Sequence, residues 1–266
     1  MSVSFTAASS TSLAMSTAGT FPLADPFTVG AWLRCRAGSA STLAAWTLAA
    51  TSDYFFCGQT NSVWEVNAND GTAGTTISLT GLFAVNVWTH VIARFITATN
   101  RRASGLRIDG TFVTGSNAVS VGMANAVRFF LGGIGVTTPT GFLDVDIADF
   151  WWTNVDIGSA VAADLTYAEH LALISPQNNA QQARKLKLFQ SFRSGWEQRT
   201  PEEFLNTNGV LMPQWTPSAT KPVGGLQPPW VALPSWNRAA MKGKVPTAAA
   251  FVGDEDGVWY IPMQAA

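Results

Sequence analysis

The feature that most constrains the fold is a succession of short runs in which hydrophobic side chains alternate with others. In Phe27–Cys35, every second position carries Phe, Val, Ala, Leu or Cys, and Trp32 falls between them. Successive side chains of a β-strand point to opposite faces, so this period of two indicates a strand with one buried face. We expect Trp32 to lie on the other face.

Other runs of this kind fill the first 174 residues. They are rich in Val, Ile, Phe, Trp and Thr and are separated by Gly, Asn, Asp and Ser, which is typical of strands and turns. A polar turn is predicted at residues 99–105, and Asp109-Gly110 is a second turn signal. Strands at this spacing indicate an all-β sandwich or barrel. The further predicted strands are residues 87–95, 106–110, 127–133 and 141–152.

One helix is clearly predicted, over residues 166–174. Thr166 can cap the helix, and Glu169, three residues later, completes a capping box. The helix is expected to end at Ser175-Pro176. A second, weaker helix is expected within residues 178–189.

The composition changes after residue 174. The first 174 residues hold three of the thirteen prolines and no lysine, whereas the remainder holds ten prolines, all five lysines and five of the eleven tryptophans. Proline has no backbone N–H to donate, so regular ladders become rare where it recurs. We therefore expect a mostly extended, Pro- and Trp-rich C-terminal arm. Its last stretch, residues 248–262, predicts two short strands around an acidic turn, suited to adding to a sheet edge.

Charge and cysteine content exclude several classes of function. With 47% hydrophobic and 12% charged residues, the chain is expected to be globular. The net charge is -1 and no basic cluster exceeds the pair Arg101-Arg102, so neither nucleic acid nor membrane is a predicted partner. No secretory signal or membrane-spanning run is visible. Cys35 and Cys57 are expected to be buried free thiols and not part of a zinc site.

Six short stretches resemble, in order, the laminin-G-like branch of the concanavalin-type lectin/glucanase superfamily. The resemblance implies a two-sheet antiparallel jelly roll over residues 1–175. It leaves residues 176–266 as an arm that packs on this domain or on neighbouring subunits. The stretches are FTVGAW at 27–32, WTHV at 88–91, LRIDG at 106–110, FLGG at 130–133, IADFWWTN at 147–154 and LTYAEHLAL at 165–173.

The resemblance extends loosely into the arm. Proteins of this type in tailed bacteriophages and prophages continue past the helix with a polar segment and a proline-rich end. Residues 188–230 correspond to that part here. The resemblance implies a component of a virion, although a fold alone does not define a function.

Asp144, Asp146 and Asp149 are the strongest catalytic candidates, because glycosidases of the resembled superfamily carry Glu at the first and last positions of this spacing. A retaining glycosidase needs two carboxyl groups about 5–5.5 Å apart. Aspartate shortens each arm by a methylene, and a misplacement of about 1 Å can cost on the order of a hundredfold in rate. We therefore expect no catalysis. Instead, Asp144 and Asp146 share the solvent face of a strand, and Asp149 lies at a bulge.

The two histidines and an Asn-rich stretch are the other polar candidates. Neither His90 nor His170 has a partner in a nucleophile motif, so both are predicted to be structural. Residues 67–71, Asn-Ala-Asn-Asp-Gly, offer oxygen ligands but lack the spacing of an EF-hand loop, and a plain Asn-Asp-Gly turn is expected at residues 69–71. The sequence therefore predicts neither a metal nor a cofactor.

Tryptophans are the predicted contact residues. Adjacent Trp151 and Trp152 must point to opposite faces of a strand, so one belongs to the core and the other is exposed or covered by the arm or a partner. The tryptophans of the arm carry apolar area that must be buried on the jelly roll or on another chain. The candidate binding residues are Trp152, Trp196, Trp215, Trp230, Trp236 and Trp259.

These features predict a non-enzymatic structural protein of a phage-like particle: a capsid decoration or minor capsid protein, or a tail or baseplate accessory. Its expected partners are other virion proteins and further copies of itself, and its expected location is the virion, assembled in the host cytoplasm. The alternative is a glycan-binding lectin domain for host adhesion, with a glycan as partner. A glycoside hydrolase ranks last.

Overall fold

The structure is a computed structural model of residues 1–266, in which the chain divides into two compact units, Met1–Pro228 and Pro229–Ala266. Each unit is considered by itself. The structure describes residues 2–16, 26–39, 43–49, 54–70, 74–118, 128–133, 140–157, 163–174, 186–190, 216–217, 223–225, 252–253 and 259–260.

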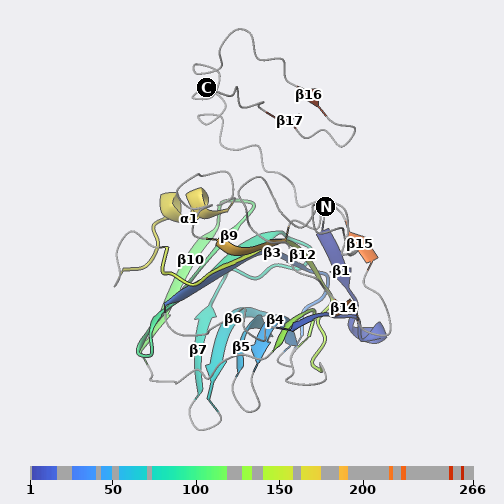
Figure 1. Ribbon diagram of the computed structural model, residues 1–266, viewed down its shortest axis with the longest axis horizontal. Coiled ribbons are helices and arrows are strands. Elements are labelled where there is room, and N and C mark those ends of the chain that lie inside the picture. The colour runs from blue at the N-terminus through green and yellow to red at the C-terminus, as the bar shows by residue number, and fades with distance from the viewer. Residues whose placement is uncertain are drawn as a thin grey trace. The chain divides into compact units, whose positions relative to one another are not determined.

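One sheet of the first unit, called sheet A, has eight antiparallel strands (Figure 1). Its strands are β1 (Ser2–Phe5), β3 (Phe27–Cys35), β8 (Thr89–Thr97), β9 (Asn100–Arg107), β10 (Phe112–Asn117), β12 (Val145–Thr153), β13 (Leu186–Gln190) and β15 (Val223–Gly225). They follow the order β10-β9-β8-β3-β12-β1-β15, and β13 pairs with the second half of β12.

The other sheet, sheet B, has seven antiparallel strands in the order β14-β2-β11-β4-β5-β6-β7. Its strands are β2 (Leu13–Ser16), β4 (Leu43–Ala49), β5 (Tyr54–Thr60), β6 (Val63–Asn69), β7 (Gly74–Leu79), β11 (Arg128–Leu131) and β14 (Thr216–Pro217). The 3-10 helix η1 (Ala7–Ser9) connects β1 of sheet A to β2 of sheet B. The result is a two-sheet antiparallel jelly-roll sandwich, which confirms the predicted all-β fold class.

The main core lies between the two sheets. Strand β3 turns its predicted face into this core, and Phe27 stacks on Phe95 with ring centroids 4.6 Å apart. Burial of each large side chain contributes about 1.5–3 kcal/mol, so this layer is the main source of stability. From sheet A the core takes Phe27, Val29, Ala31, Leu33 and Cys35, and from sheet B it takes Trp64, Val66, Ala68, Ile77 and Leu79.

The outer face of sheet A is also buried. Trp151 and Trp152 point to opposite faces, as predicted: Trp152 joins the main core, and Trp151 packs against Ile92 on the outer side. A Cβ at Gly30 would lie 2.3 Å from Cζ2 of Trp151, so glycine is needed for the indole to lie across β3. Sheet A is therefore sandwiched between two apolar layers.

The helix α1 (Tyr167–Leu173) begins at the predicted capping box. Thr166 Oγ1 accepts a hydrogen bond from Glu169 N at 3.3 Å, and Glu169 Oε2 accepts one from Thr166 N at 2.7 Å. The weaker helix expected at 178–189 is wrong for its last four residues, which belong to β13 because their backbone extends sheet A along β12. No helix in the described ranges is long and apolar enough to cross a membrane.

The turn predicted at residues 99–105 is shorter than expected: it lies at Ala98–Thr99, where Thr97 pairs with Asn100, and β9 continues from Asn100 to Arg107. Its polar side chains are accommodated within the strand. The guanidinium of Arg101 lies over the Phe95 ring, 4.8 Å from its centroid, and Arg102 pairs with Asp164. The second turn signal is confirmed, since Gly110 has a φ of 93° between β9 and β10.

The edge strands of the two sheets differ on the two sides of the sandwich. On one side the edge strands β7 and β10 meet, where Asn117 Nδ2 donates to Thr76 O at 3.2 Å. On the other side β15 pairs with β1 and β14 pairs with β2, and each is the last strand of its sheet. Strands β14 and β15 therefore extend both sheets, and the compact unit reaches Pro228, well beyond the expected boundary at residue 175.

The second unit, Pro229–Ala266, contains the two short strands predicted in residues 248–262. Strand β16 (Val252–Gly253) pairs antiparallel with β17 (Trp259–Tyr260). They form a two-stranded sheet of their own. The acidic residues of the sequence lie between them, as expected.

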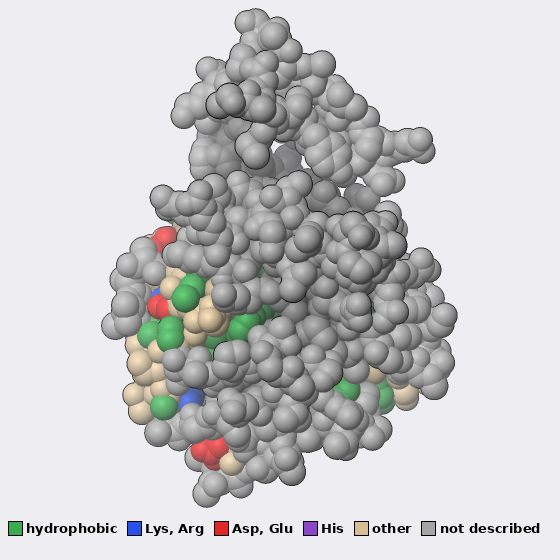
Figure 2. Space-filling model, viewed as in Figure 1, with side chains coloured by type: hydrophobic (Ala, Val, Ile, Leu, Met, Phe, Trp, Pro, Cys, Tyr) green, Lys and Arg blue, Asp and Glu red, His purple; other side chains and the backbone are tan. Residues whose placement is uncertain are grey.

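Among the described residues, the exposed large hydrophobic side chains are those of Val85 and Tyr167. On the described part of the face shown in Figure 2, hydrophobic side chains are visible together with isolated basic and acidic ones.

Candidate functional site

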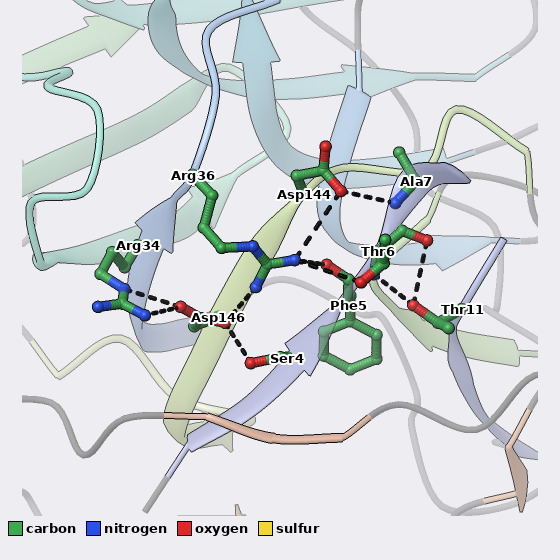
Figure 3. Close-up of polar contacts among 9 residues, drawn as sticks. All are labelled: Ser4, Phe5, Thr6, Ala7, Thr11, Arg34, Arg36, Asp144 and Asp146. Carbon is green, nitrogen blue, oxygen red and sulfur yellow. Dashed lines mark hydrogen bonds and ion pairs between the residues drawn. The ribbon is translucent and has the colours of Figure 1, made fainter. Parts of the chain in front are cut away.

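A polar cluster centred on Asp146 lies on the outer face of sheet A (Figure 3). The register of β12 places Asp146 between Ser4 of β1 and Arg34 of β3. Arg34 Nε donates to Oδ2 of Asp146 at 2.7 Å, while Arg36 and Ser4 donate to Oδ1. The Arg34 guanidinium also lies 5.3 Å from the ring centroid of Trp88. The carboxylate of Asp146 is thus fully surrounded by donors.

Arg36 connects this cluster to the N-terminal segment. Its Nη2 donates to the carbonyl of Phe5 and lies 3.8 Å from Oδ1 of Asp144. The same Asp144 oxygen accepts a hydrogen bond from Ala7 N at 2.8 Å, at the start of η1. The two aspartates and two arginines therefore hold β1 and η1 against β3 and β12.

The expectation that Asp144 and Asp146 share a solvent face is wrong for Asp146, whose side chain is 0% exposed. The two residues do share a face, but Ser4, Arg34 and Arg36 cover Asp146. A buried charge is tolerated when it is paired and hydrogen-bonded. The sequence carried a signal for this pairing, because the two arginines have the same two-residue spacing as the two aspartates.

This arrangement differs from that of a glycosidase pair. A retaining glycosidase needs one carboxylate as nucleophile and one carboxyl group that donates a proton to the leaving group. Here Asp144, at the first position of the glycosidase spacing, contacts the guanidinium of Arg36, and Asp149, at the last position, is buried at an irregularity of β12. The geometry therefore supports a structural ion-pair cluster.

Asp149 lies at a bulge, as predicted. The register of β12 with β3 shifts between Ala148 and Trp151, and Asp149 has a φ of 44°. Its side chain is buried. The bulge shifts the alternation of side chains in the second half of β12, so that Trp151 points to the outer face.

His90 and His170 meet in a second buried polar group, between β8 and α1. Nδ1 of His90 lies 3.1 Å from Nε2 of His170, and Nδ1 of His170 lies 2.8 Å from Oγ of Ser104. Both imidazoles are completely buried. Burial lowers the pKa of His170 to about 3, and burial together with repulsion from His170 lowers the pKa of His90 well below its ordinary value. Their meeting had no signal in the sequence, since one lies on a strand and the other on a distant helix.

Of the predicted contact tryptophans, Trp152 is the one whose side chain is described. Trp152 is 1% exposed in the main core, so its prediction as a contact residue is wrong: its strand face turns inward. Trp259 lies in β17, of which the backbone is described. The other four, Trp196, Trp215, Trp230 and Trp236, lie outside the described residues.

The two thiols and the Asn-rich stretch are also placed. Cys35 and Cys57 are free and buried, as predicted, and burial raises the pKa of both thiols. Asn67 belongs to β6, where its Nδ2 donates to Thr76 Oγ1 of the neighbouring β7 at 2.6 Å. The Asn-Asp-Gly turn expected at residues 69–71 falls where β6 ends at Asn69, before β7 begins at Gly74, and residues 71–73 of this connection lie outside the described residues. Within the described part of the chain, no three His, Cys, Asp or Glu side chains gather as metal ligands.

No family model matches the sequence, and no curated protein matches it. Solved structures do. Domains LG4-5 of the mouse laminin alpha1 chain are 16% identical, with 58% of this chain and 42% of that chain covered and a TM-score of 0.46. A heptameric SAP-like pentraxin from Limulus polyphemus is 12% identical over 66% of this chain and 82% of that one, with a TM-score of 0.47. The LG1-3 region of the laminin alpha2 chain is 13% identical, with 57% of this chain and 30% of that chain covered and a TM-score of 0.44.

The similar structures thus include laminin G domains, the fold that the six sequence stretches resemble. The chain spans less than half the length of either laminin structure. These likenesses concern the fold only. The two stacked sheets and their register define this chain as a two-sheet antiparallel jelly roll.

Proposed function

We propose that this chain is a non-catalytic binding module that acts through protein–protein contacts made by its C-terminal part. The observation that carries the proposal is the division between Pro228 and Pro229, where the two-sheet sandwich gives way to a short second unit. The sandwich would act as a compact body, and the second unit as the contact segment.

The second unit, Pro229–Ala266, is shorter than most domains that are stable by themselves. Domains below about 40 residues usually need disulfides, metals or association to be stable. The sequence of Pro229–Ala266 contains no cysteine, yet it includes Trp230, Trp236 and Trp259. Burial of a large apolar side chain contributes about 1.5–3 kcal/mol, and aromatic residues are enriched at protein interfaces. Another protein surface is therefore the partner we infer.

Within this proposal the chain is a structural protein of a phage-like particle, as a capsid decoration or minor capsid protein or as a tail or baseplate accessory. Its partners are other virion proteins and further copies of itself, and its location is the virion. The sequence resemblance of residues 188–230 to the arms of phage proteins supports this assignment. The net charge of -1 also fits contacts with proteins better than contacts with nucleic acid.

The proposal is tested by truncating the chain after Pro228 and measuring incorporation into particles assembled in the host. Loss of incorporation is expected for the truncated chain. Trp230→Ala, Trp236→Ala or Trp259→Ala should weaken binding by tenfold or more, on the order expected for an aromatic anchor. Val85→Ser, which removes an exposed hydrophobic side chain of the sandwich, is the matched control. Undiminished incorporation of the truncated chain would contradict the proposal.

Glycan binding is a second candidate, favoured by the outward face of β6 and β7. Here Glu65, Asn67 and Asn69 alternate with core residues, and Thr76 and Ser78 are exposed. Carboxylate, amide and hydroxyl groups supply the donors and acceptors that sugar hydroxyls require.

A glycan array probed with the full chain tests this candidate. Binding that is lost in Asn67→Ala and Glu65→Ala, but kept in Asp109→Asn at an exposed turn, would establish it. An array without signal, or equal binding by all three variants, would eliminate this face as a glycan site.

A further inference from the structure

The outer face of sheet A is covered by a cap, defined as residues 154–157 and 163–174, which includes α1. Figure 1 shows α1 beside β9 and β10. Ile157, Leu165 and Leu173 of the cap pack against Ile92 and Trp151 in a cluster separate from the main core. The cap thus has a small apolar layer of its own.

Two arginines of the sheet anchor the segment before α1. Arg94 of β8 donates from Nε and Nη2 to the two oxygens of Asp156 at 2.7 and 2.8 Å, and from Nη1 to Ala163 O at 2.8 Å. Arg102 of β9 donates to Asp164 at 2.6 Å. These pairs hold the cap as long as both aspartates are ionised.

α1 itself is anchored by the buried histidine pair. When both rings are neutral, one nitrogen of the 3.1 Å contact between His90 and His170 carries the proton and donates a hydrogen bond, and the other nitrogen accepts this hydrogen bond. If both rings were protonated, two N–H groups and two positive charges would face each other in a fully buried site. Ser104 contacts the remaining nitrogen of the His170 ring, and Trp32 and Phe112 contact the pair with ring edges or faces.

The charged groups around the pair are already engaged with other partners. Asp156 and Asp164 bind arginines, and Glu169 accepts the hydrogen bonds of the capping box. The titratable and charged groups on the elements packed around the pair are Arg34 and Cys35 on β3, Arg94 on β8, Arg101, Arg102 and Arg107 on β9, Asp146 and Asp149 on β12, and Asp156, Asp164, Tyr167 and Glu169 in the cap.

We propose that the cap is an acid-sensitive lid: protonation of the His90–His170 pair releases α1 and uncovers the outer face of sheet A. This device is independent of the contacts proposed for the C-terminal part. It would expose the apolar surface of Ile92 and Trp151 to solvent only under acidic conditions.

The direction of the pH dependence follows from the two imidazoles. In the closed cap, burial keeps the pKa of both imidazoles below that of a free imidazole, which is about 6.5. The pKa of His170 is lowered to about 3. The closed cap is therefore fully favoured above about pH 6.5 and is weakened as the pH falls below it. Each imidazole shifts the opening equilibrium about tenfold per pH unit, and the pair about a hundredfold.

Opening of the cap is expected to be local. The main core between the two sheets does not include the cap residues, so the sheets can stay together when α1 leaves. Segments with few apolar contacts open at lower free energy than the core.

Hydrogen exchange of the full chain, between about pH 7 and 5, tests the proposal. Carboxylates with ordinary pKa values of about 4 remain ionised in this range. After correction for intrinsic rates, the protection factors of amides in residues 167–173 should fall by up to about a hundredfold per pH unit below pH 6.5, while those of β5 and β6 stay constant. Constant protection of α1, or an equal fall in both regions, would overturn the proposal.

Variants assign the effect to the histidines. His90→Gln combined with His170→Gln should abolish the pH dependence of exchange in α1. Glu169→Gln is the matched control, because glutamine keeps the capping box and removes the titratable group next to His170. Persistence of the pH dependence in the double variant would overturn the proposal, and if that variant does not fold, the comparison of α1 with β5 and β6 in the unmodified chain decides.

Discussion

At the scale of single residues, the outer face of sheet A shows how buried polar groups are tolerated. Asp146 is surrounded by Arg34, Arg36 and Ser4, and His170 lies between His90 and Ser104. A buried charge without a partner costs several kcal/mol, whereas a paired one is retained at little net cost. Whether each of these groups can be buried therefore depends on its hydrogen-bond and ion-pair partners.

Asp146→Asn should destabilise the protein by about 3–5 kcal/mol, because it leaves two guanidinium groups without their shared carboxylate. The free energy of unfolding, measured by urea titration, checks this value. Asp109→Asn, which removes a carboxylate paired with Arg107 at an exposed turn, should have a much smaller effect. Similar losses for both variants would show that Asp146 is not a buried anchor.

Gly30→Ala should destabilise the protein by about 1–3 kcal/mol, because the new Cβ would overlap the indole of Trp151. Combination with Trp151→Leu should recover part of this loss, since the two changes act on one contact. The measurement is a double-mutant cycle of unfolding free energies. Strict additivity would argue against close packing of Trp151 on β3.

At the scale of elements, local sequence decides where α1 begins and backbone pairing decides where the sheets end. The capping box of Thr166 and Glu169 is a local device that the sequence shows directly. Strands β14 and β15 are only two and three residues long, and their place depends on the free edges of β2 and β1. Edges left open invite pairing with other chains.

Thr166→Ala should destabilise α1 by about 1 kcal/mol, because Glu169 N loses its acceptor. Hydrogen exchange of residues 167–173 should then be roughly fivefold faster at neutral pH. Thr166→Ser keeps the hydroxyl and should leave the rates nearly unchanged. If alanine and serine behave alike, the hydroxyl group of Thr166 does not contribute to the stability of this helix.

Truncation after residue 215 should make the protein self-associate, because it removes β14 and β15 and leaves the edges of β1 and β2 open. Truncation after Pro228 keeps both strands and is the matched control. Sedimentation velocity of the two truncated chains gives the comparison. Equal sedimentation of the two would indicate that residues 216–225 do not protect the edges.

At the scale of the whole molecule, the chain consists of a sandwich unit up to Pro228 and a short unit after it. The two sheets bury the main core between them, and sheet A is covered again on its outer side. Stability is therefore concentrated in the first unit. The second unit is below the size at which a domain usually maintains its own core.

Limited digestion of the free full chain with trypsin should cut first at Arg238, Lys242 or Lys244, because the second unit opens at lower free energy than the sandwich. Mass spectrometry of the products identifies the first site. A first cut at Arg34, Arg36, Arg94 or Arg101, all within sheet A or at its end, would contradict the division of stability between the units.

The sequence by itself determined the features whose signals are local. The alternation in β3, the capping box of α1, the turn at Gly110 and the pair β16 and β17 were all readable, because period and turn chemistry act between neighbouring residues. Tertiary structure alone decided the contacts between distant segments. The burial of Asp146, the meeting of His90 with His170 and the burial of both Trp151 and Trp152 depend on which strands and helix cover each face, and residue spacing does not encode this.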